Sequence, residues 1–166
     1  IINSYAEDEL DNTLEIVNSI DKIIYLIYAT ENLSIISYNL ISHKKMIEIK
    51  NAHKTAITNF RGYLDKIYLR DLILSISDDD NIIKIWTIYG NNTIDFLLEI
   101  KANQVGYLYS ACILKENNNL YIISSNSYSG DSENIKVFDM KGEKIKEINN
   151  SNDKIFPFML QRIKIL

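Results

Sequence analysis

One strand–turn–strand pattern occurs three times along the chain, and this repetition constrains the fold more than any other feature. In each copy an apolar run leads into a polar turn, and a second apolar run then closes on an aromatic residue. The closing aromatics are Tyr38, Trp86 and Phe138, so successive copies lie 48 and 52 residues apart. Repeats of about 40–50 residues are typical of solenoids and propellers rather than of one undivided core.

Further short apolar runs flank each copy, which gives four expected strands per repeat. The runs are short and rich in Ile, Tyr, Val and Leu, and Asn, Asp, Ser or Lys residues bound them. This pattern is typical of strands joined by turns. A short helical turn within residues 7–18 is an alternative, but a strand is preferred for its second half. The sequence therefore predicts an all-β chain with antiparallel repeats over approximately residues 12–50, 51–101 and 102–148 and a partial repeat over residues 153–166. In the second repeat the first strand is expected at residues 56–60.

The second repeat resembles the WD40 repeat family. Residues 75–86, Ser-Ile-Ser-Asp-Asp-Asp-Asn-Ile-Ile-Lys-Ile-Trp, resemble the family's Ser-Gly-Ser-Asp-Asp-x-Thr-Ile-Lys-Leu-Trp core, with a turn one residue longer. Ala52-His53 resembles the family's Gly-His dipeptide, and Val137-Phe138-Asp139 resembles Leu-Trp-Asp. The resemblance implies a β-propeller of about three four-stranded antiparallel WD40-like blades plus a partial one. Three blades cannot close a ring of the usual size, so it also implies a fragment of a larger propeller.

The family's structural tetrad can be transferred only to the second repeat, because the other two lack the Gly-His dipeptide and the tryptophan. It would comprise His53, Ser75 or Ser77, Asp80 and Trp86. In this relay Asp accepts a hydrogen bond from His, His bonds to the Ser hydroxyl, and the hydroxyl meets the indole N–H. A buried indole N–H and imidazole need such partners. The relay would lock the turn and hold the repeat together.

Catalytic and metal-binding interpretations of these residues have less support than the structural tetrad. A Ser-His-Asp triad is the alternative to the tetrad, but no nucleophile elbow or oxyanion-loop glycine accompanies these residues. Asp78-Asp79-Asp80 could suggest a calcium loop, which would need glycine where Ile83 stands and glutamate where Tyr89 stands. We therefore expect no catalytic residue, no metal site and no cofactor.

A longer loop in the third repeat is the candidate binding element. It contains Tyr128 and Asp131 and ends at Glu133. The preferred interpretation is an inserted surface loop without a binding role. The sharper hypothesis is that the loop is a contact or phosphorylation site, because insertions between strands often carry binding residues.

Composition limits the partners and the compartment. The net charge of −4 gives no basic footprint for nucleic acid. No apolar run is long enough to span a bilayer. The single cysteine, Cys112, excludes an intramolecular disulfide and fits a reducing compartment, and no signal peptide is found. We therefore expect an intracellular, cytoplasmic protein without nucleic-acid or membrane partners, and, because the chain begins with Ile1, a fragment or a processed chain.

The resemblance implies a non-catalytic protein–protein interaction scaffold, whose loops and faces are presented to protein or peptide partners. A second hypothesis is a structural subunit of a large multiprotein complex, in which further blades or another copy of the chain complete the propeller. An enzyme or metal-dependent propeller is the third, and would need acidic or histidine side chains converging on a central channel.

Overall fold

Regular structure in the described part of this chain is entirely β. The computed structural model describes residues 14–18, 24–89, 93–102, 107–127 and 133–150. These residues form twelve strands and no helix, which confirms the predicted all-β class. It follows that the described part of the chain provides no helix long and apolar enough to cross a membrane.

The strands form three four-stranded antiparallel sheets, each with its strands in chain order. The first sheet contains β1 (Leu14–Asn18), β2 (Ile24–Ala29), β3 (Ile35–Asn39) and β4 (Lys44–Ile49). The second contains β5 (Asn59–Asp65), β6 (Arg70–Ser77), β7 (Ile82–Tyr89) and β8 (Thr93–Lys101). The third contains β9 (Tyr107–Glu116), β10 (Asn119–Ser127), β11 (Glu133–Asp139) and β12 (Lys144–Asn150).

Most strands lie where the sequence predicts them, and β5 is the main exception. It was expected at residues 56–60 but runs from Asn59 to Asp65. Arg61-Gly62 interrupts the apolar run in the sequence, yet Gly62 lies opposite Ile73 and the ladder continues to the pair Asp65–Arg70. The second half of the possible helical turn is strand β1, while residues 7–13 and the partial repeat 153–166 lie outside the described residues.

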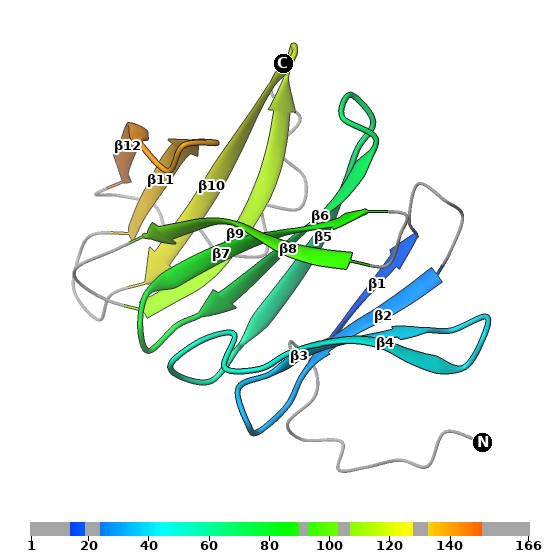
Figure 1. The fold of residues 1–166 in the computed structure, drawn as a ribbon. Helices are drawn as coiled ribbons and strands as arrows, with labels where there is room; N and C mark the ends of the chain where they lie inside the picture. Colours follow the sequence, from blue (N-terminus) through cyan, green and yellow to red (C-terminus); the bar gives the residue numbers. More distant parts are fainter. Residues whose placement is uncertain (1–13, 19–23, 90–92, 103–106, 128–132, 151–166) are drawn as a thin grey trace.

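The three sheets stack face to face, and two separate cores fill the spaces between them (Figure 1). Ile73 and Trp86 of the second sheet pack into the core shared with Tyr25 of the first sheet. Leu72 and the other alternate residues of β6 pack instead into the core shared with the third sheet. The second sheet is therefore buried on both faces, which explains why β6 reads as a continuous apolar run.

The first strands of the sheets are neighbours, since β5 contacts both β1 and β9. The later strands of each sheet lie progressively farther from this contact, so the sheets fan outward (Figure 1). Each sheet is also irregular at the same place. The ladder to the fourth strand shifts register immediately before the closing aromatic, at Ser37/Tyr38, Ile85/Trp86 and Val137/Phe138. The three repeats thus share one local design, as β-bulges at equivalent positions indicate.

Candidate functional site

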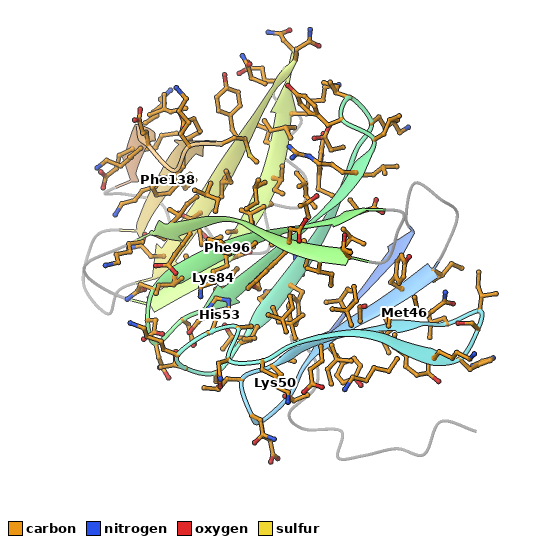
Figure 2. The ribbon with its side chains drawn as sticks, in the orientation of Figure 1. Met46, Lys50, His53, Lys84, Phe96 and Phe138 are labelled. Carbon is orange, nitrogen blue, oxygen red and sulfur yellow. The ribbon has the colours of Figure 1, made fainter. Side chains whose placement is uncertain are left out.

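Three of the four predicted relay residues meet at the junction of the first and second sheets. Ser75 on β6 is completely buried, with 0% of its surface exposed. Its Oγ lies 2.7 Å from Nε2 of His53 and accepts the indole N–H of Trp86 at 2.8 Å. His53 stands in the connection between β4 and β5, and Trp86 on β7 (His53 is labelled in Figure 2). Ser75 is therefore the shared partner of the imidazole and the indole, as the relay predicts.

Ser77 has a different partner. Its hydroxyl is buried and forms a hydrogen bond with Oγ1 of Thr55, in the same connection between β4 and β5. The two serines of β6 therefore hold this connection at two points, and only Ser75 belongs to the relay.

Asp80 lies at the relay without completing it. His53 Nδ1 and Asp80 Oδ2 are both buried, and neither has a hydrogen-bond partner among the described residues. The turn from Asp78 to Asn81 is one residue longer than the family's, and it closes with Asn81 at φ 54 and its N–H on the Asp78 carbonyl at 3.1 Å. The carboxylate therefore acts on His53 through its charge and not through a hydrogen bond.

Burial keeps the imidazole neutral. The pKa of His53 is lowered from 6.5 to about 4, first by desolvation and then by the charge of Lys84, while the charge of Asp80 opposes this and raises it. At neutral pH the His53 ring is therefore uncharged when it forms its hydrogen bond with Ser75.

In the second and third repeats, a lysine forms a hydrogen bond with the segment that connects its sheet to the preceding sheet. Lys84 Nζ donates to the carbonyl of Ala52 at 2.7 Å, and Lys136 Nζ donates to the carbonyl of Ala102 at 3.1 Å. Each lysine stands two residues before a closing aromatic, Trp86 or Phe138. Sequence reasoning missed this contact, although the shared order of alanine, lysine and aromatic in the second and third repeats could have revealed it.

The third sheet has a serine equivalent to Ser75, but the tryptophan that would donate to it is absent. Ser124 lies opposite Lys136, as Ser75 lies opposite Lys84. Phe138 replaces the tryptophan and has no N–H, and the Ser124 hydroxyl is buried without a hydrogen-bond partner in the described ranges. In the first sheet Tyr28 occupies the equivalent position, opposite Ile36. The relay is thus confined to the second repeat in the part of the chain that is described.

The closing aromatics have unequal surroundings. Trp86 packs into the core with the first sheet and Phe138 into the core with the second, and both are buried. Tyr38 is only half-buried and lies opposite Leu26. Since Tyr25 and Ile27 point to the second sheet, alternation directs Leu26 and Tyr38 to the outward face of the first sheet.

The candidate binding loop lies largely outside the described residues. Tyr128 and Asp131 are not described, and Glu133 begins β11 opposite Asn150 of β12. Their role in binding stays a prediction.

The geometry assigns structural work to the residues that could have suggested chemistry. Ser75 Oγ is completely buried and engaged by both His53 and Trp86, so no substrate can reach it. The Cys112 thiol on β9 is half-buried, and burial raises its pKa, which keeps it protonated. Among the described residues no group of three or more His, Cys, Asp or Glu side chains could hold a metal ion.

No protein-family model matches the chain, and no curated protein matches it either. The resemblance to WD40 repeats therefore stays a prediction from the residues of the second repeat.

Proposed function

We propose that the chain is part of a WD40-type β-propeller that acts as a non-catalytic scaffold for protein or peptide partners. The observation that carries this proposal is the stacking of three four-stranded meanders whose first strands lie side by side. Blades of a propeller pack in this way around a central axis, because each buries a face against its neighbours. The Ser75 relay and the repeated lysine-to-alanine contacts support the same reading.

The scaffold interpretation is preferred to an enzyme because His53 and Ser75, the histidine and serine of the alternative triad, are bonded to each other and to the fold. His53, Ser75 and Trp86 form one hydrogen-bonded unit, and Ser77 is paired with Thr55. A relay of this kind stiffens a blade. A rigid blade can present loops to a partner at low entropic cost.

Co-purification of the whole protein from its own cells tests the scaffold. We expect a second protein at a constant ratio, released by salt or by competition and unchanged in covalent structure. A protein that elutes alone at every ionic strength, with no partner in any fraction, would contradict the proposal.

A structural subunit completed by further blades or by another copy of the chain is the second candidate. It is favoured by the outward face of the first sheet, where Ile24, Leu26, Tyr28 and Tyr38 are half-buried. The same face of the second sheet, with Trp86, is covered by the first sheet. Apolar sheet faces of this kind are covered in stable proteins.

Size-exclusion chromatography with light scattering tests completion. We expect the 166-residue chain to self-associate, and Tyr38→Asp to reduce that association, because a carboxylate on a packed face is costly. Lys50→Asp, at an exposed position after β4, is the matched control. A stable monomer with no tendency to associate would exclude this candidate.

A further inference from the structure

The end of the β5–β6 hairpin exposes three consecutive apolar side chains. Ile67, Tyr68 and Leu69 are 43%, 67% and 67% exposed, which is unusual for neighbouring residues of this size. Figure 1 shows this loop as the projecting end of the hairpin. The equivalent β9–β10 hairpin turns through Asn117 and Asn118 alone. We name residues 66–69 the hairpin tip.

The hairpin tip is held in one conformation by hydrogen bonds to Asp65, the last residue of β5. Asp65 is 1% exposed, and its Oδ1 accepts the N–H groups of Ile67 at 3.2 Å and Tyr68 at 3.4 Å. Its Oδ2 accepts a hydrogen bond from Nε of Arg70 at 3.1 Å. The Arg70 guanidinium in turn lies 5.0 Å from the centroid of the Tyr68 ring. Leu69 adopts φ 48, in the left-handed region. A buried carboxylate thus fixes an exposed apolar tip, so little conformational entropy is lost when the tip is bound.

The hairpin has a small positive net charge although the chain is acidic. The β5–β6 hairpin contains the cations Arg61, Lys66 and Arg70 and the anions Asp65 and Asp71, so its formal net charge is +1, whereas that of the whole chain is −4. Both anions are buried, so the exposed charge near the tip is positive. A basic element on an acidic protein is complementary to a locally acidic surface. Tyrosine and arginine are also the residue types that most often dominate binding energy when they enter a pocket.

We propose that the hairpin tip inserts Tyr68 and Leu69 into an apolar pocket of a protein partner, with acidic side chains at the pocket rim facing Lys66 and Arg70. This inference rests on the proposed scaffold function and names its contact surface. Apolar tips flanked by cations also suit membrane surfaces. The contacts of Asp65 hold the tip in one conformation, which suits a shaped protein pocket and is not required at a fluid membrane surface, so a protein pocket is favoured.

Site-specific photo-crosslinking in the whole protein tests the proposal. p-Benzoylphenylalanine replaces Tyr68 in the protein's own cells, and replaces Asn118, at the end of the β9–β10 hairpin, as the matched control. We expect a protein adduct from position 68 and none from position 118, with the crosslinked segment of the partner containing Asp or Glu beside apolar residues. The purified partner should bind the Tyr68→Ser, Leu69→Ser double variant at least about ten-fold more weakly than the original protein. The double variant should keep its melting temperature, since both side chains are exposed.

Three results would overturn the proposal. One is the absence of an adduct specific to position 68, and another is a crosslinked partner that binds the double variant unchanged. The third is sedimentation of the protein with vesicles of phosphatidylcholine and phosphatidylserine in equal parts, if Tyr68→Ser abolishes it. If position 68 gives no adduct while the protein still co-purifies with a partner, the tip is excluded and the scaffold function stands. If no partner co-purifies, both fall.

Discussion

Replacing Ser75 by alanine tests whether the relay holds the second sheet in place. The change removes the acceptor of the Trp86 indole N–H and the partner of His53 Nε2, both of which are buried. A buried polar group left unpaired costs roughly 1–3 kcal/mol. Two such groups, with some local relaxation, give an expected loss of about 2–4 kcal/mol in the free energy of unfolding.

The third sheet provides a matched control at the equivalent position. Ser124 is buried like Ser75, but its hydroxyl has no hydrogen-bond partner among the described residues. Ser124→Ala removes the same hydroxyl and leaves no new group unpaired. We therefore expect a change within about 0.5 kcal/mol, or a small stabilisation.

Equilibrium unfolding in urea measures both variants. Fluorescence of Trp86, the single tryptophan, reports on the second sheet, and far-ultraviolet circular dichroism reports on all strands. A double-mutant cycle with Trp86→Phe isolates the bond between serine and indole, and should give a coupling free energy of about 1 kcal/mol. Equal losses in Ser75→Ala and Ser124→Ala would refute the reasoning, because the loss would then reflect the buried position and not the relay.

Three further changes follow from the same contacts. His53 binds its proton less readily in the folded state, with a pKa of about 4 against 6.5, so stability is complete above about pH 6.5 and falls toward pH 4 by up to about 3 kcal/mol. Urea midpoints across this range should lose part of their slope in His53→Asn and keep it in His43→Asn, an exposed control; identical slopes in the two variants would contradict the assignment. Trp86→Ala should cost about 3–5 kcal/mol, as for other buried aromatics, and an unchanged melting temperature would exclude Trp86 as a core residue. Asp65→Ala should release the hairpin tip, which hydrogen exchange would detect as faster exchange at the Tyr68 amide; unchanged exchange would show that the carboxylate does not order the tip.

The strand pattern was predictable because each strand is an apolar run between Asn- or Asp-rich turns. Residue choice within the relay was not. Ser75 and Ser77 are two positions apart on β6 and therefore share a face. Only the register, with Ser75 opposite Lys84 and Ser77 opposite Ile82, decides which hydroxyl reaches Trp86. That register depends on the turn from Asp78 to Asn81, whose length the sequence does not convert into a pairing.

The exposure of the hairpin tip was likewise hidden in the sequence. Ile67-Tyr68-Leu69 reads as an ordinary apolar run and would suit a buried strand. Its exposure arises because β5 continues to Asp65, beyond Gly62, and carries the turn away from the core. Composition carries no information on how far a hairpin extends.

The contacts at the two alanines also determine how the chain would respond to force. Each connection passes from the last strand of one sheet to the first strand of the next, and the alanine N–H bonds to a turn carbonyl of the sheet before it: Ala52 to Leu33 and Ala102 to Asn81. Lys84 and Lys136 clamp the same alanines from the following sheet. Tension on the chain ends would therefore act on the hydrogen bonds at Ala52 and Ala102 one after the other. The chain would then extend in steps of one sheet, as each set of hydrogen bonds breaks.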